Sequence, residues 1–190
     1  MFEALSQTLA AWVIAAGSVF VSPESSTEVD FSQPTLTLEE NRIVLSVELV
    51  DWHTEEMDRI LESGQTLTIH FDLDVYQERE QAPYNSYSFD HAITMDLIDQ
   101  TYHINCSEQE LEYQTTTLNE MRNHAGSLRS FNLLDLNELQ GDTSFVFELR
   151  AHLENIDLPG LMNDFDMMRY WRGKIPRLES PSFKRSDFLL

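Results

Sequence analysis

Histidine and carboxylate side chains that could bind a metal occur together in one short segment. His70, Asp72 and Asp74 alternate with apolar residues, so on a β-strand all three lie on one face. Neighbours would be about 6.6–6.8 Å apart, at about 3.3–3.4 Å per residue. Such a His-x-Asp-x-Asp set can converge on one ion. The outward polar face of an exposed strand produces the same pattern, and we favour that interpretation.

Two more histidines and the single cysteine are weaker candidates for chemistry. His91 and His103 flank a predicted turn at residues 99–100 and could face each other across a hairpin, but we favour ordinary cross-strand packing as their role. Cys106 is followed closely by Glu108, and such negative charges disfavour the thiolate that a nucleophile needs. We therefore interpret Cys106 as a buried or inert residue.

The common catalytic signatures are missing from the sequence. It contains no Gly-x-Ser-x-Gly elbow, no His-Glu-x-x-His pair, no Cys-x-x-Cys pair and no glycine-rich turn between a strand and a helix. With 33 acidic residues, a pair of carboxylates can arise by chance and indicates little. The sequence favours a non-catalytic protein and leaves an enzymatic role open. We expect no cofactor and no bound metal.

The densest run of aromatic and flexible apolar residues lies near the C-terminus. Methionine and tryptophan suit adaptable binding surfaces and membrane boundaries. We predict that this segment binds a partner, or that it closes the edge of a sheet and completes the core. The candidate binding residues are Phe165, Met167, Met168, Tyr170, Trp171 and Arg172.

Composition bounds the class of protein. The 190 residues fit one domain with tails, and 42% of them are hydrophobic, which is enough for a core. The formal net charge of -21 repels phosphate backbones, so we expect no nucleic-acid partner. One cysteine excludes a disulfide framework within the chain.

Positive charge is concentrated at the C-terminal end. Residues 169–190 hold six of the 12 basic residues and only two acids, Glu179 and Asp187. This segment can fold back on the acidic body, or it can contact an acidic partner or lipid headgroups. It lacks the dense run of Lys and Arg that marks a nucleic-acid or phosphoinositide site.

The N-terminal region is typical of a targeting segment. Residues 8–21 carry no charge and have the length of the apolar part of a secretory signal, with small residues near Ser18 for cleavage. No basic residue precedes this run, and a buried N-terminal helix is the alternative. We expect a periplasmic protein, free or anchored to the inner membrane. The expected organisation is a signal-like or anchor segment at 1–28, a sheet domain at 29–160, and an aromatic and basic segment at 161–190 that completes the domain.

Alternation of apolar and polar residues predicts an antiparallel sheet. It is clearest at 43–50, 66–76 and 145–153, with a hairpin partner near 35–38 and a weaker pair at 87–98 and 101–106. Two short helices interrupt these strands, near 52–63 and 118–128. The predicted fold class is therefore α+β, a curved antiparallel β-sheet or sandwich with two short helices.

The ends of both helices carry capping residues. Asp51 is placed to cap the first helix, and Gly64 stands where a left-handed C-terminal cap is needed. Thr117 and Glu120 form the sequence pattern of a capping box at the start of the second helix.

Several short motifs resemble the bacterial family DUF4390, a domain of unknown function. The pattern Leu-x-x-Gly ends the first helix at Gly64, and Tyr-x-x-Arg closes the following strand at Arg79. A short helix at 118–128 and a strand at 145–153 follow in order, then Leu-Pro at 158–159 and the aromatic step Tyr170-Trp171-Arg172. The similarity covers about residues 30–183.

The resemblance implies an exported or membrane-anchored protein of the bacterial envelope, with genes often beside two-component sensor kinases. We therefore expect an envelope or membrane-associated protein partner, and peripheral membrane contact through the N-terminal segment or the basic C-terminus. The alternative function is a carrier that holds an apolar ligand such as a lipid inside the curved sheet. Many members carry more Arg and Trp at 81–85 than this acidic chain, so a basic surface there is not carried over.

Overall fold

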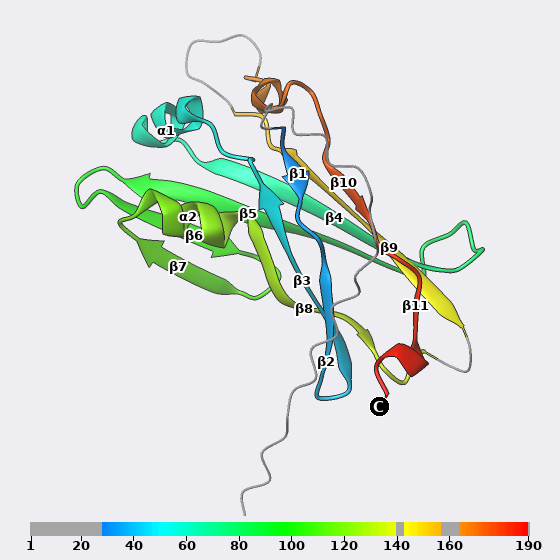
Figure 1. Cartoon of the computed structure of the whole chain (residues 1–190). Coiled ribbons are helices and arrows are strands. Elements are labelled where there is room, and N and C mark those ends of the chain that lie inside the picture. The colour runs from blue at the N-terminus through cyan, green and yellow to red at the C-terminus, as the bar shows by residue number, and fades with distance from the viewer. Residues whose placement is uncertain (1–27, 140–142, 157–163, 190) are drawn as a thin grey trace, which may run out of the picture.

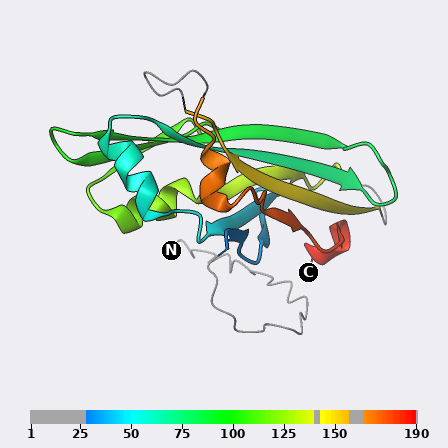
Figure 2. The same cartoon turned by 90° about the horizontal axis from the view of Figure 1, so that it is seen from above.

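The computed structural model describes residues 28–139, 143–156 and 164–189. Two antiparallel sheets form separate layers, with two α-helices beside them (Figures 1 and 2). The predicted α+β fold is confirmed. Within the described ranges, no helix has both the length and the apolar character needed to cross a membrane.

The smaller sheet is built around β3 (Arg42–Val50). Strands β2 (Thr35–Glu39) and β8 (Ser127–Asp135) both pair with β3, and β1 (Asp30–Phe31) pairs with its last two residues. The predicted hairpin is present, because β2 and β3 are joined by Glu40 and Asn41, both with positive φ (46° and 69°). Two such residues characterise the tight turns whose twist matches a hairpin.

The larger sheet has the order β10-β9-β4-β5-β6-β7, and β11 also pairs with β9. Its central strand β4 buries every second residue, as the alternation predicted, and the opposite face is polar. The strand bounds are β4 Leu67–Gln77, β5 Asn85–Asp96, β6 Thr101–Cys106, β7 Leu111–Thr115, β9 Ser144–Leu153, β10 Arg177–Glu179 and β11 Phe183–Lys184.

Helix α1 (Glu55–Glu62) is shorter at its start than predicted. Thr54 is the N-cap residue, and Asp51 instead takes a left-handed conformation (φ 54°) in the connection from β3. The C-terminal expectation is confirmed: Gly64 has φ 80°, and its N–H donates to the carbonyl of Leu61. This arrangement satisfies the last helical carbonyls.

Helix α2 (Leu118–Ala125) ends three residues before the predicted position. Thr117 caps it by accepting from the N–H of Glu120, but the Glu120 carboxylate bonds to the hydroxyl of Thr115 rather than completing a capping box. Gly126 is the C-cap residue, so Leu128 belongs to β8. Helix α2 lies on the same side of the large sheet as the small sheet (Figure 2).

The C-terminal segment completes the large sheet after a short 3-10 helix, η1 (Met167–Trp171). Strands β10 and β11 pair with β9, and a second 3-10 helix, η2 (Arg185–Asp187), follows them. The predicted signal-like run at 8–21 lies outside the described residues.

Candidate functional site

A cavity of about 300 Å³ opens between η1 and the connection from β3 to α1. Asp51, His53 and Thr54 line it from the β3–α1 connection. Tyr170, Trp171 and Arg172 line it from η1 and the residue after it. We call it the Trp171 cavity. It contains three of the six residues that the sequence predicted for binding.

The structure divides the predicted binding segment into core and surface. Met167 and Trp171 are buried (0% and 4% exposed), whereas Phe165, Met168 and Tyr170 are half-buried and Arg172 is exposed. The segment therefore completes the core and also presents part of its side chains at the surface. The two sequence interpretations apply to different residues of the same segment.

Backbone pairing and ring contacts hold this segment in place. Phe165 forms an isolated bridge with Ile156, with hydrogen bonds of 2.7 and 3.1 Å between their backbones. The Phe165 and Tyr170 rings lie 6.0 Å apart, and the Arg169 guanidinium lies 5.3 Å from the Phe165 ring. Such contacts fix the orientation of η1 against the sheet.

Two non-glycine residues with left-handed backbone conformations line opposite sides of the cavity. Asp51 and Arg172 both have φ of 54°. Asp tolerates this region better than Arg, because its short polar side chain can hydrogen-bond to the local backbone. Side chains held this way are often found where a protein places a group for binding. The conformation of Arg172 also lets the chain reverse directly after η1.

Thr54 and His53 make the floor of the cavity polar. The Thr54 hydroxyl is buried and has no hydrogen-bond partner within the described residues. His53 accepts from Nε of Arg122 through its Nδ1 (3.0 Å), and its Nε2 lies 3.0 Å from Oδ1 of Asp58. Burial lowers the pKa of His53; Asp58 opposes this shift and Arg122 adds to it. Because Nδ1 accepts from Arg122, the neutral form of this imidazole carries its proton on Nε2.

Opposite charges meet at the rim of the cavity. Lys174 forms an ion pair with Glu28 at 3.4 Å, and both residues line the rim. The guanidinium of Arg172, in contrast, makes no hydrogen bond or ion pair with any residue the structure describes. Arg172 is thus available to an acidic group from outside the chain.

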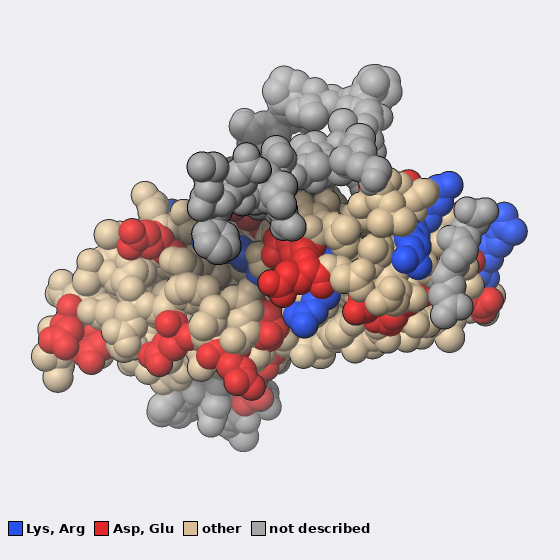
Figure 3. All heavy atoms as spheres, turned by 90° about the horizontal axis from the view of Figure 1, so that it is seen from below, with Lys and Arg blue, Asp and Glu red and all other residues tan. Residues whose placement is uncertain are grey.

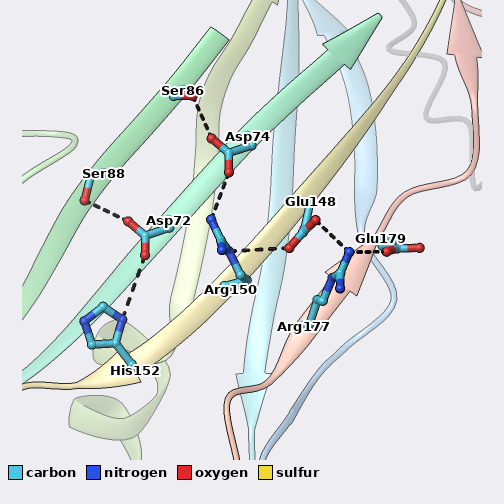
Figure 4. Close-up of polar contacts among 9 residues, drawn as sticks. All are labelled: Asp72, Asp74, Ser86, Ser88, Glu148, Arg150, His152, Arg177 and Glu179. Carbon is cyan, nitrogen blue, oxygen red and sulfur yellow. Dashed lines mark hydrogen bonds and ion pairs between the residues drawn. The ribbon is translucent and has the colours of Figure 1, made fainter. Parts of the chain in front are cut away.

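The predicted His70, Asp72 and Asp74 set lies on the outer face of β4 and does not converge. His70 pairs with Asp90 on β5. Asp72 contacts His152 (3.9 Å), and Asp74 pairs with Arg150 (2.9 Å). Figure 4 shows the last two carboxylates pointing to different partners on β9. The favoured interpretation, a polar outer face, matches this arrangement.

His91 and His103 do not face each other. His91 pairs in register with Cys106 and is buried on the inner face, whereas His103 pairs with Thr94 and contacts Glu112 on the outer face. Cys106 is 3% exposed, as expected for a buried cysteine. A turn centred at residues 99–100, as predicted, lies about one residue too late to pair His91 with Cys106.

Sequence reasoning also missed His53 and Thr54 as parts of a binding site. Both lie in the short connection between β3 and α1, and neither belongs to a motif.

The family model described as Domain of unknown function (DUF4390) matches residues 26–176. No curated protein and no solved structure matches the chain.

Proposed function

We propose that this chain, which belongs to the DUF4390 family, is a non-catalytic protein-interaction module of the bacterial envelope. In this proposal, an acidic peptide segment of a partner protein docks at the Trp171 cavity. The observation that carries it is the guanidinium of Arg172, which has no partner among the described residues, beside the half-buried ring of Tyr170.

The chemistry of the cavity supports a peptide side chain as the ligand. Arginine binds carboxylates through parallel N–H donors, and aromatic residues supply contact area with little entropy loss. The hydroxyl of Thr54, which has no hydrogen-bond partner in the part of the chain that the structure describes, offers a further hydrogen bond inside. A volume of about 300 Å³ is at the small end for ligand pockets and suits one anchoring side chain.

The distribution of charge supports an acidic partner at this position. The chain as a whole is strongly negative, so an acidic partner is repelled from most of its surface. Half of the basic residues follow residue 168, on the same segment as Tyr170 and Arg172. The face seen in Figure 3 carries Asp and Glu along its whole length and fewer Lys and Arg, as the net negative charge of the chain requires.

The interior of the sandwich favours this role over that of an apolar-ligand carrier. A carrier needs space between its sheets, but the phenylalanines that would line it are packed against one another. Phe71 and Phe89 stack with ring centroids 5.4 Å apart, and Phe145 and Phe183 lie 6.3 Å apart. All four are at most 4% exposed.

An envelope location is proposed from the sequence. It is supported by the uncharged run at 8–21 and the polar residues that follow it. A fusion of residues 1–30 to alkaline phosphatase tests this part separately. Phosphatase activity is expected, because the enzyme folds only outside the cytoplasm. An inactive fusion, with the full chain in the cytoplasmic fraction, would contradict the location and leave the binding proposal intact.

The docking site is tested by photocrosslinking in cells. A benzoyl-phenylalanine at residue 170 is expected to give one protein adduct, with the crosslink in an acidic segment of the partner. Arg172→Glu should abolish this adduct, whereas Arg185→Glu makes the same charge change outside the cavity and should retain it. Equal loss in both variants would show that only net charge matters. A phospholipid adduct, or none, would contradict the proposal.

A further inference from the structure

Three side chains with metal-binding atoms meet on the inner face of the large sheet. Nε2 of His91, Sγ of Cys106 and a carboxylate oxygen of Glu108 all lie within 4.8 Å of one another. His91 and Cys106 are 0% and 3% exposed, and the side chain of Glu108 is 3% exposed. Nitrogen, sulfur and oxygen donors of these types are the protein ligands of zinc.

The fold explains why these residues meet. His91 on β5 and Cys106 on β6 are directly opposite in the antiparallel register, which places their Cβ atoms about 4.5–5.5 Å apart. Glu108 lies two residues after Cys106, in the turn that leads to β7, and its carboxylate folds back toward the imidazole. Nε2 of His91 and Oε2 of Glu108 are 3.1 Å apart.

The second nitrogen of His91 is also fixed. Its Nδ1 lies 2.7 Å from the backbone carbonyl oxygen of Ala125, at the end of α2. A carbonyl can only accept, so Nδ1 carries a proton and donates it. Nε2 then points at the carboxylate of Glu108, and two bare acceptors at this distance would repel. Either a proton, carried by Nε2 or by the carboxyl group, or a metal ion must therefore lie between them.

We propose that His91, Cys106 and Glu108 bind a divalent transition metal, with Zn²⁺ as the best fit. Ligands about 2.0–2.3 Å from zinc in a tetrahedron lie roughly 3.3–3.7 Å from one another, which is close to the His91–Glu108 distance. A metal-bound histidine commonly donates its other N–H to a backbone carbonyl, as His91 does to Ala125. This site differs from the sequence-based expectation of no bound metal.

A cavity adjoins one of the three proposed ligands, Glu108. This cavity of about 460 Å³ lies between the β6–β7 turn and β8. Its walls include Gln109, Leu111, Arg129 and Phe131. A metal ion can reach the buried donors along the Glu108 side chain, and a water molecule can take the open position.

Without a metal, a proton lies between Nε2 of His91 and the carboxylate of Glu108, which are 3.1 Å apart. Metal binding at Nε2 displaces this proton, so zinc uptake releases protons into solution.

The test is a titration of the full chain after dialysis against a chelator. Calorimetry with ZnCl₂ is expected to show one equivalent bound, with heats that vary with the ionisation enthalpy of the buffer because protons are released. Co²⁺ in place of Zn²⁺ should give a sulfur-to-cobalt charge-transfer band. Cys106→Ser should remove this band and weaken zinc binding by at least about tenfold.

A matched variant separates this site from the other histidines. His103→Ala removes a partly exposed histidine on β6, the strand that also carries Cys106. The zinc affinity of this variant should equal that of the natural chain. Circular dichroism confirms that each variant is folded. If Cys106→Ser does not fold, the cobalt spectrum of the natural chain decides alone. No binding, or binding without a sulfur band, or equal loss in His103→Ala would overturn the proposal.

Discussion

The indole N–H of Trp171 donates to the backbone carbonyl oxygen of Trp52 at 2.7 Å, across 119 positions of sequence. Both residues are buried, at 4% and 3% exposed. Their hydrogen bond joins η1 to the β3–α1 connection, and these are the two segments that enclose the Trp171 cavity. The stability of the core and the shape of the proposed docking site therefore depend on the same contact.

Trp171→Phe tests this contact. Phenylalanine keeps an aromatic ring but has no N–H, so the Trp52 carbonyl loses its donor in a buried place. We expect the free energy of unfolding to fall by about 1–3 kcal/mol, measured by urea denaturation. Tyr170→Phe, on the adjacent half-buried ring, is the control and should change the free energy of unfolding by less than about 0.5 kcal/mol. A Trp171→Phe protein of natural stability would contradict the assigned role.

Gly126→Ala should destabilise the domain by steric overlap. A Cβ at Gly126 would collide with Nε1 of Trp52 and would lie 3.0 Å from the carbonyl oxygen of Leu49. We expect a loss of about 1–3 kcal/mol, because overpacking forces neighbours to shift. Gly173→Ala is the comparison: it meets nothing within 4 Å but has φ 71°, so about 1 kcal/mol of backbone strain is expected. Thermal denaturation of both variants checks whether Gly126→Ala loses more stability than Gly173→Ala.

Acid should destabilise the domain through His53. The pKa of His53 is lowered in the folded state by burial, an effect that Asp58 opposes and Arg122 reinforces. The unfolded chain takes up a proton near pH 6.5 that the folded chain binds only at lower pH, so stability falls as pH drops below that value. The melting temperature should fall less steeply between about pH 7 and 5 in His53→Gln. Parallel curves for both proteins would show that His53 does not contribute.

The outer face of the large sheet offers a test of ion-pair strength. Arg150 bridges Asp74 (2.9 Å) and Glu148 (3.4 Å), two carboxylates that are only 17% and 16% exposed. Arg177 continues this series of ion pairs, because it contacts both Glu148 and Glu179 (Figure 4). A double-mutant cycle of Arg150→Met and Asp74→Asn should give a coupling of about 0.5–1 kcal/mol that weakens in high salt.

The more exposed pair of Arg177 and Glu179 is the matched control for that cycle. Their side chains are 55% and 68% exposed, so solvent screens their attraction. The cycle of Arg177→Met and Glu179→Gln should give a smaller coupling, near the bottom of the range for surface pairs. A coupling as large as that of Arg150 and Asp74 would show that burial of the carboxylates is not what strengthens the pair.

The strands that alternate regularly were predictable, and the irregular ones were not. β4 and β9 bury every second residue along their length, so their pattern is visible in the sequence. β8 buries adjacent residues at 127–128 and 133–134, because its pairing with β3 shifts register twice and Ser130 has φ 50°. Leu128 also continues the apolar face of α2, which explains its wrong assignment to that helix.

The two candidate sites show what local patterns omit. The aromatic segment could be predicted from its composition, but its partner, the β3–α1 connection, is set by tertiary packing alone. Asp51 was predicted as a helix cap from its residue type, and the structure uses its tolerance of positive φ instead. His91 and Cys106 needed the correct turn, because moving the centre of a hairpin by one residue changes every cross-strand partner by two.

Strand β9 lies between β4 on one side and β10 and β11 on the other, and the last two are formed by residues later in the sequence. A chain emerging from the ribosome therefore presents one edge of β9 unpaired until residues 177–184 have also been synthesised. An open edge next to a largely complete apolar face is a template for aggregation. Nascent chains of this protein consequently pass through an interval in which this edge of β9 is open to pairing with another chain.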